Sequence, residues 1–142
     1  MKNTKIIVKT KNKNYPIYIG ENIINLTGSL IKKNLSGVKN ICVIADKNLP
    51  VYLLNNLKKS LKNYNVKIYK FNVSEKMKSF LVANKIIEDL LKNNFNRSDC
   101  IIAFGGGIIG DLSGLVSSLT KRGLKFVNIP STLLAQVDAS IG

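Results

Sequence analysis

The sequence of 142 residues has no histidine and no tryptophan, and only two cysteines and three prolines. Without histidine it lacks the commonest metal ligand and the commonest general acid–base side chain. No apolar run reaches the roughly 18 residues that a membrane-spanning helix needs, and the run that follows Met1 is too short for a signal peptide. Cys42 and Cys100 fall in predicted buried strands and are interpreted as core residues in a reducing compartment. We therefore expect a cytoplasmic protein with no metal site in these residues and no membrane partner.

Acidic residues are also scarce, so that 22 Lys and Arg against 8 Asp and Glu give a net charge of +14. A balance of this kind is found in proteins that bind nucleic acids or membranes. Here, however, 20 of the basic residues are lysines, and they are scattered among 18 asparagines without an arginine cluster or interleaved tryptophan. We interpret this composition as a lysine- and asparagine-rich surface of the type that A/T-rich genomes encode, and we expect no nucleic-acid partner.

The apolar pattern predicts one globular domain that covers residues 1–142. The predicted strands are 5–9, 15–19, 40–45, 66–71, 99–104 and 125–129, and the predicted helices are 21–35, 50–64, 78–95 and 108–119. The first two strands are predicted to form a β-hairpin. From residue 40 onward strands and helices alternate, which indicates an α/β fold with a doubly wound, Rossmann-like parallel sheet after a small N-terminal β-hairpin. Such sheets bind ligands at the carboxyl ends of their strands.

The most informative stretch runs from Cys100 to Asp111, where a short apolar strand ends in three glycines and a helix follows. Glycines leave the backbone free in φ and open to close approach, and a helix N-terminus attracts phosphate. The spacing Gly105-x-Gly107-x-x-Gly110 fits the dinucleotide fingerprint, although a tight turn that only permits packing fits it as well. No acidic residue lies about 20 residues downstream to bind a ribose, so the remainder of a dinucleotide site has to come from elsewhere in the chain.

Four further candidates follow the other early strands. Asp46 can accept hydrogen bonds from ribose hydroxyls, and the Asn48 amide can form hydrogen bonds with the edge of an adenine base. Both residue types also favour turns. Glu75 and Lys78 share one helical face, where they can pair with each other or hold one ligand. The same residues also suit an ordinary helix start with Ser74 as its N-cap.

The later candidates surround the last predicted helix and strand. Asp111 is placed in the first helical turn, where we expect it to touch a hydroxyl or an amide and not a phosphate. The planar guanidinium of Arg122 can bind a phosphate or a carboxylate through two hydrogen bonds, in a chain whose other basic residues are nearly all lysines. A basic last turn is also a normal helix stop. Ser131 and Thr132 present hydroxyls or cap a helix, and Asp138 is a polar residue among apolar neighbours.

The motifs Gly105-Gly-Gly-Ile-Ile-Gly-Asp111, Arg122-Gly123 and Pro130-Ser-Thr-Leu-Leu-Ala-Gln-Val-Asp-Ala-Ser-Ile-Gly142 together resemble the 3-dehydroquinate synthase family. Iron-containing alcohol dehydrogenases share the glycine motif but lack the Leu-Leu-Ala-Gln-Val-Asp continuation. The resemblance implies NAD as cofactor, and a divalent metal, zinc or cobalt, in a C-terminal helical domain. The implied reaction converts a phosphorylated sugar acid, 3-deoxy-D-arabino-heptulosonate 7-phosphate, into 3-dehydroquinate, in the second step of the shikimate pathway. The family also implies a homodimer.

By match of motif, the residues that the resemblance assigns to NAD are Asp46, Asn48, Glu75, Lys78, Gly106, Gly107, Ile108, Asp111, Ser131 and Thr132. It assigns Arg122 and Asp138 to the substrate, and it gives these 142 residues no catalytic residue and no metal ligand. The sequence departs from the family where Asn72-Val73-Ser74 replaces Pro-Asp-Gly, and it stops at Gly142, where the family continues with Gly-Lys. We expect the metal domain to lie beyond that point and these residues to be inactive alone. A non-catalytic nucleotide-binding remnant and another sugar phosphate cyclase, such as 2-deoxy-scyllo-inosose synthase, are the alternatives.

Overall fold

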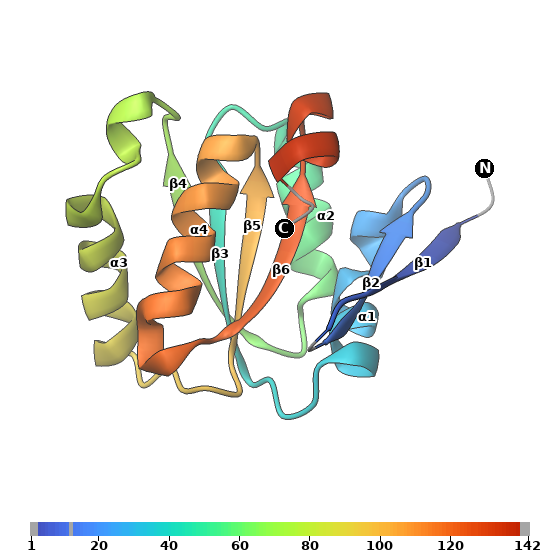
Figure 1. Cartoon of the computed structure of the whole chain (residues 1–142), viewed down its shortest axis with the longest axis horizontal. Coiled ribbons are helices and arrows are strands. Elements are labelled where there is room, and N and C mark those ends of the chain that lie inside the picture. Colours follow the sequence, from blue (N-terminus) through green and yellow to red (C-terminus); the bar gives the residue numbers. More distant parts are fainter. Residues whose placement is uncertain (1–2, 12, 140–142) are drawn as a thin grey trace.

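The structure is a computed structural model that describes residues 3–11 and 13–139 (Figure 1). Its elements in chain order are β1 (Thr4–Lys9), β2 (Asn14–Ile19), η1 (Ile23–Leu26), α1 (Thr27–Asn34), β3 (Asn40–Asp46), α2 (Val51–Ser60), β4 (Asn65–Phe71), η2 (Glu75–Met77), α3 (Phe80–Lys92), β5 (Cys100–Gly105), α4 (Gly107–Leu119), η3 (Thr120–Arg122), β6 (Lys125–Pro130) and η4 (Ala135–Ala139). Strands and helices alternate from β3 onward, as the apolar pattern predicts.

Four parallel strands form the central sheet in the order β4-β3-β5-β6, and β1 and β2 form a separate antiparallel hairpin. The chain leaves β3 through α2 to reach β4 on one side, and then passes through α3 to β5 on the other side. The strand order therefore reverses between β3 and β5, and open α/β sheets bind their ligands at the carboxyl ends of strands at such a switch point. The predicted doubly wound, Rossmann-like sheet with an N-terminal hairpin is confirmed.

Helices cover both faces of the sheet (Figure 1). Along β3 the side chains alternate, so that Ile41, Val43 and Ala45 join the core under α1 and α2, while Cys42 and Ile44 join the core under α3 and α4. All five side chains are fully buried. Burial on both faces is the reason why the strands in the middle of this sheet read as continuous apolar runs.

The two cysteines lie on neighbouring strands but on opposite faces of the sheet. Cys42 belongs to the core under α3 and α4, and Cys100 belongs to the core under α1 and α2. Both thiols are free, and burial raises the pKa of each to about 12. They are core residues, as the sequence predicts, and they stay protonated at neutral pH.

One buried carboxylate ties together the amino edge of the sheet. Asp99 accepts hydrogen bonds from the backbone N–H groups of Asn40 (2.9 Å), Asn96 (2.9 Å) and Lys39 (3.3 Å), and from the side-chain amide of Asn40 (3.0 Å). Burial raises the pKa of Asp99, but the hydrogen bonds from Asn40, Asn96 and Lys39 outweigh it, so the pKa lies below its ordinary value. The charged form of Asp99 therefore stabilises the fold.

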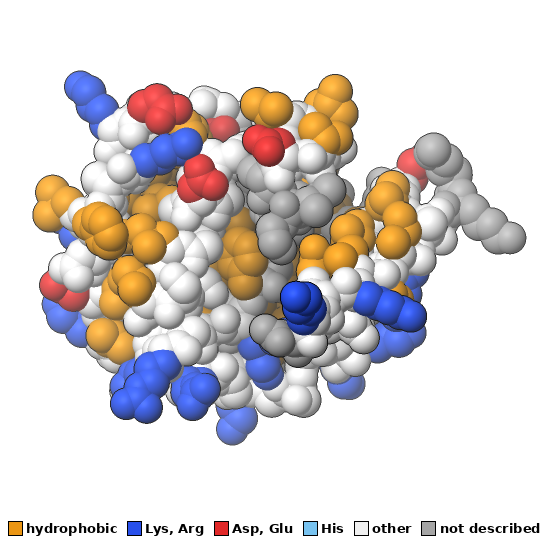
Figure 2. Space-filling model, viewed as in Figure 1, with side chains coloured by type: hydrophobic (Ala, Val, Ile, Leu, Met, Phe, Trp, Pro, Cys, Tyr) orange, Lys and Arg blue, Asp and Glu red, His pale blue; other side chains and the backbone are white. Residues whose placement is uncertain are grey.

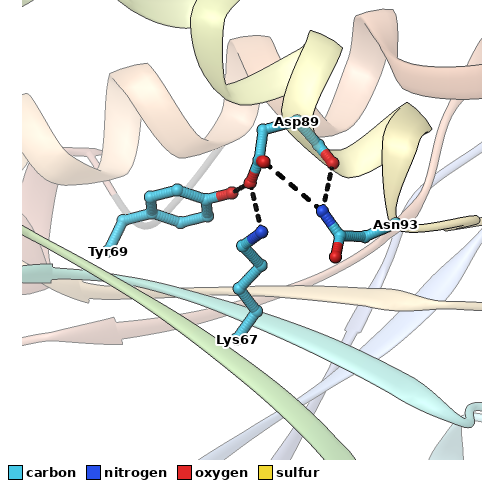
Figure 3. Close-up of polar contacts among 4 residues, drawn as sticks. All are labelled: Lys67, Tyr69, Asp89 and Asn93. Atoms are coloured by element: carbon cyan, nitrogen blue, oxygen red, sulfur yellow. Dashed lines mark hydrogen bonds and ion pairs between the residues drawn. The ribbon is translucent and has the colours of Figure 1, made fainter.

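A second polar cluster links the edge strand β4 to α3 (Figure 3). The Asp89 carboxylate accepts a hydrogen bond from the Tyr69 hydroxyl and pairs with Lys67 Nζ at 2.5 Å, while the Asn93 amide donates to the Asp89 carbonyl at 2.6 Å. The Lys67 ammonium, and next the Tyr69 hydroxyl, lower the pKa of Asp89. Because Lys67 and Asp89 remain 34% and 40% exposed, the cluster adds little stability, but a lysine here discourages unwanted pairing at the sheet edge.

The main difference from the predicted elements lies at the first helix. The predicted helix 21–35 is divided into the short 3-10 helix η1 and the α-helix α1, and it begins only at Ile23, because Asn22 adopts a left-handed conformation with φ 55°. Within residues 3–11 and 13–139, no helix combines the length and the apolar character needed to cross a membrane.

Candidate functional site

The turn between β5 and α4 contains glycines with different roles. A Cβ on Gly105 would lie 2.8 Å from Ile109 Cγ1, so this glycine allows α4 to pack tightly against the end of the strand. Gly106 has φ −80° and ψ −170°, an extended conformation that any residue adopts. The expectation that the glycines are needed for freedom in φ is therefore wrong at Gly106, and close approach is the remaining reason for glycine there.

The amino end of α4 suits an anion. Gly107 and Ile108 are its first two residues, the N-cap residue Gly106 has no side chain to occupy the N–H groups, and the first turn carries no acidic residue. First-turn N–H groups lack intrahelical acceptors and bear partial positive charge. A Cβ on Gly106 would lie 3.4 Å from Thr132 Cγ2, so the glycine keeps open a gap between the turn and Thr132. The turn and the helix end together leave space and partial positive charge that suit an anion.

A carboxylate from the end of β3 lies beside the glycine turn. In the parallel register Ala45 pairs with Phe104, so Asp46 and Gly105 follow side by side at the switch point. Asp46 Oδ1 accepts a hydrogen bond from the N–H of Asn48 at 2.8 Å, and the Asn48 side chain is exposed. The turn role of these two residues is thus confirmed, and the same turn presents them next to the glycines.

Ser131 and Thr132 follow β6 and lie beside the same glycine turn. The last pair of β5 and β6 is Gly105 with Pro130, and the Ser131 N–H donates to the Gly105 carbonyl at 2.9 Å. Thr132 Oγ1 accepts a hydrogen bond from the Ala135 N–H at 3.2 Å, so the threonine caps the final turn of the described chain. Both side chains are exposed, and both border the glycine turn.

Asp111 and Lys78 form an ion pair across two elements. Lys78 Nζ lies 3.1 Å from Asp111 Oδ2, at the edge of a hollow of about 160 Å³ that Phe80 and Leu115 also line. The hydrogen bond to Asp111, then the charge of Glu75, raise the pKa of Lys78. Asp111 is the fifth residue of α4 and lies in its second turn, so the predicted first-turn position is wrong.

The segment before α3 differs from the expected helix start. Ser74 makes no capping hydrogen bond, and Glu75 lies in the short helix η2. The N-cap of α3 is Ser79, whose Oγ accepts a hydrogen bond from the Val82 N–H at 3.3 Å. Lys78 links the two helices and directs its ammonium to Asp111 rather than to a helical neighbour.

Arg122 is a predicted site residue that lies at the amino ends of the strands, opposite the glycine turn. The 13 residues of α4 run from the glycine turn to the amino edge, a distance of about 20 Å at 1.5 Å per residue, and Arg122 follows them. The helix stops here as predicted, with Gly123 at φ 112° and its N–H bonded to Thr120 at 2.9 Å. Lys121 and Arg122 also have positive φ, at 50° and 66°, which is uncommon outside glycine. The Arg122 guanidinium does not reach the glycine turn of its own chain.

Asp138 lies in η4, beyond β6, and its side chain is exposed at the carboxyl edge. In Figure 2, acidic side chains near this end of the sheet lie beside some lysine or arginine side chains, and further lysine and arginine side chains line the opposite end. The most exposed large apolar side chains of the described chain also follow carboxyl strand ends, and they are Val51, Tyr52, Phe80, Leu81, Leu133, Leu134 and Val137, each at least 64% exposed. Exposed apolar side chains at this end of the sheet are available for contact with a ligand or with another protein surface.

Sequence reasoning found the carboxyl-edge residues but missed the pairing of Lys78 with Asp111. No local signal reveals it, because the two residues are 33 positions apart (111 minus 78) and meet only through the packing of α3 against α4. In the described part of the chain, no cluster of three or more His, Cys, Asp or Glu side chains is arranged to hold a metal ion.

A parallel sheet with a glycine turn at its switch point and an open helix end after it is the architecture of Rossmann-like nucleotide-binding domains. Comparison with known proteins identifies the family within this class. The family described as 3-dehydroquinate synthase N-terminal matches residues 68–142, and the chain belongs to the 3-dehydroquinate synthase family. The resemblance seen in the sequence motifs is confirmed.

Individual proteins agree with this assignment. The 3-dehydroquinate synthase of Pelagibacter ubique (strain HTCC1062) is 48% identical over 138 residues, which are 97% of this chain and 38% of that protein. The crystal structure of 2-deoxy-scyllo-inosose synthase complexed with carbaglucose-6-phosphate, NAD+ and Co2+ matches with a TM-score of 0.85 at 23% identity, over 96% of this chain and 38% of that one. A 2-epi-5-epi-valiolone synthase from Streptomyces hygroscopicus subsp. jinggangensis 5008, with NAD+ and Zn2+ bound, matches with a TM-score of 0.65 at 22% identity, over 78% of this chain and 32% of that one. At these identities the two structures show a shared fold, and the chain spans well under half the length of each protein.

Proposed function

We propose that the chain forms the NAD-binding part of a 3-dehydroquinate synthase. The whole enzyme would convert 3-deoxy-D-arabino-heptulosonate 7-phosphate into 3-dehydroquinate with release of phosphate, the second step of the shikimate pathway. The observation that carries this proposal is the juxtaposition of Asp46 and the glycine turn at the switch point, in a chain 48% identical to a 3-dehydroquinate synthase. The non-catalytic remnant has no observation in its favour.

The residues around the glycine turn fit the cofactor. NAD supplies a reversible hydride acceptor when it is bound. The first-turn N–H groups of α4, at Gly107 and Ile108, bind the pyrophosphate, and Gly106 leaves room for it. Asp46 accepts hydrogen bonds from ribose hydroxyls, and Asn48 reads the adenine edge.

The remaining cofactor contacts come from the flanking elements. Ser131 and Thr132 offer hydroxyls on the β6 side of the turn. Glu75 approaches from η2, Asp111 contacts a hydroxyl or an amide of the ligand rather than its phosphates, and Lys78 belongs to the cofactor site through its ion pair with Asp111. Together these groups orient the dinucleotide along the carboxyl edge.

For the substrate we propose Asp138 and Arg122. The two residues lie at opposite edges of the sheet, so one small substrate contacts both only if its second contact is Arg122 of the partner subunit in a homodimer. A guanidinium suits this role because its planar fork matches a phosphate or a carboxylate. The homodimer is therefore part of the proposal.

We also propose a divalent metal, zinc or cobalt, bound by residues outside this chain, and a cytoplasmic location. The support for the metal is the presence of Co2+ and Zn2+ in the two structures that share the fold. None of the residues assigned above is a metal ligand, and none is a catalytic residue.

The test uses the full natural protein. Phosphate release from 3-deoxy-D-arabino-heptulosonate 7-phosphate is measured with and without NAD and zinc, with a hexose 6-phosphate as the competing substrate. We expect turnover of the heptulosonate that requires both additions. Turnover of the hexose phosphate alone would assign the protein to another cyclase, and NAD binding without any turnover would support the remnant.

A further inference from the structure

The proposed cofactor site contains an electrostatic conflict. Asp111 is the fifth residue of α4, so its Cα lies about 6 Å along the helix axis from Gly107, where the pyrophosphate is expected. That distance is shorter than the Debye length of about 8 Å at physiological salt, so solvent screening alone does not remove the repulsion. A carboxylate at this position would weaken the binding of an anion to the same helix end.

Lys78 is the group that resolves this conflict. Its Nζ lies 3.1 Å from Asp111 Oδ2, and it comes from a different part of the chain, between η2 and α3. The pKa of Lys78 is raised by its hydrogen bond to Asp111 and by the charge of Glu75, so the ammonium form is favoured. The lysine brings a positive charge to the one carboxylate that lies on α4 close to the glycine turn.

The ion pair is poorly suited to a purely structural role. Its side chains are 44% and 55% exposed, and exposed pairs contribute little to stability. The segment that carries Lys78 is held independently, because Met77 is buried in the core under α3 and α4 and Ser79 caps α3. Removing the pair should therefore leave the fold intact.

We infer that Lys78 is a positioning residue that neutralises Asp111, so that the amino end of α4 can accept the pyrophosphate of the dinucleotide. This inference rests on the proposed NAD site and adds to it a coupling between two residues. Lys78 acts through Asp111 in this arrangement, and not by a direct contact with phosphate. The consequence is that the loss caused by removing Lys78 depends on whether Asp111 is charged.

A double-mutant cycle in the full natural protein tests the coupling. The variants are Lys78→Met, Asp111→Asn and the double variant, with Lys78→Arg as the matched control that keeps the charge. NAD affinity is measured by calorimetry at low and high salt, and the melting temperature is measured without ligand. Asparagine at position 111 keeps a hydrogen-bonding group for a ligand hydroxyl, so only the charge is lost.

We expect Lys78→Met to weaken NAD binding by about tenfold at low salt, and less at high salt, with an unchanged melting temperature. The double variant should recover to within about threefold of the wild type, because the repulsion is removed with the carboxylate. Lys78→Arg should bind like the wild type.

Two results would overturn the inference while leaving the NAD site in place. If the double variant binds as poorly as Lys78→Met, the lysine contacts the ligand directly. If Lys78→Met melts lower and loses affinity equally at every salt concentration, the pair only supports the fold. A wild-type protein that does not bind NAD would instead refute the proposed function, and the role of the pair with it.

Discussion

Neighbouring glycines in one turn should respond in opposite ways to the same small substitution. At Gly105 an added Cβ would lie 2.8 Å from Ile109 Cγ1 and 2.9 Å from Ile109 Cβ, distances that side chains do not tolerate. At Gly106 the nearest atom would be Thr132 Cγ2 at 3.4 Å, close to ordinary contact, and the backbone is already extended. Gly105→Ala therefore tests packing, and Gly106→Ala tests the ligand cradle.

The expected magnitudes follow from these contacts. Overpacking by one methyl group costs about 1–3 kcal/mol, and in a protein longer than about 150 residues each kcal/mol lowers the melting temperature by about 2–4 °C. We therefore expect Gly105→Ala to melt about 2–12 °C lower than the wild type in the full natural protein. Gly106→Ala should melt within about 3 °C of the wild type, because the reduced freedom of the unfolded chain offsets a tight contact.

The assay compares melting temperatures with and without saturating NAD in the full natural protein. A ligand that binds only the folded state raises the melting temperature by mass action. Gly105→Ala should keep the wild-type rise from its lower starting point, whereas Gly106→Ala should lose most of it, since the methyl group enters the gap beside Thr132. A full NAD-induced rise in Gly106→Ala would show that this glycine serves only the turn, and the pyrophosphate assignment would be wrong.

Three other predictions concern residues outside the turn. Arg122→Lys should raise the Michaelis constant for the substrate with little change in NAD affinity, and an equal loss of both would place Arg122 in the cofactor site or the fold. The 142 residues alone should release no phosphate from the heptulosonate substrate even with added zinc, and any release above a no-protein control contradicts this. Asp99→Asn should cost about 1–3 kcal/mol at neutral pH, because asparagine offers one acceptor oxygen to donors that now share two. The folded pKa of Asp99 is depressed, so its contribution is present above the unfolded pKa and is lost as pH falls through the folded pKa; acid titration of stability should be steeper in the wild type than in Asp99→Asn.

Most of the fold follows from apolar periodicity. The strands in the middle of the sheet are buried on both faces, and such strands read as unbroken apolar runs, so β3 and β5 were predictable to within a residue or two. The predicted helix 21–35 was less accurate, because Asn22 turns left-handed and the following turn is 3-10. Local conformations of this kind depend on contacts with α2 that periodicity does not contain.

The sequence predicted that the site residues follow the carboxyl ends of strands. It did not predict which of these residues are neighbours in the fold. The sequence indicates that Asp46 and the glycines both follow strands, but only the order β4-β3-β5-β6 places them side by side. In the same way, the charge pattern does not reveal that Lys78 pairs with Asp111, or that Asp99 accepts bonds from residues 59 and 60 positions earlier. These contacts arise from tertiary packing, for which a single sequence has no local signal.

The residues at the amino ends of the strands stabilise the fold, whereas those at the carboxyl ends form the proposed binding site. At the amino edge the buried Asp99 is fully engaged by hydrogen bonds from the chain itself. At the carboxyl edge the helix α4 starts without a side-chain cap, and apolar side chains such as Phe80 and Leu133 are about three-quarters exposed, at 74% and 75%. Open donors and exposed apolar side chains at these strand ends suit the binding of a ligand or of another protein surface. A substitution at the amino ends of the strands should therefore lower the melting temperature equally with and without NAD, whereas one that enters the proposed NAD cradle at the carboxyl ends, such as Gly106→Ala, should change the difference between the two.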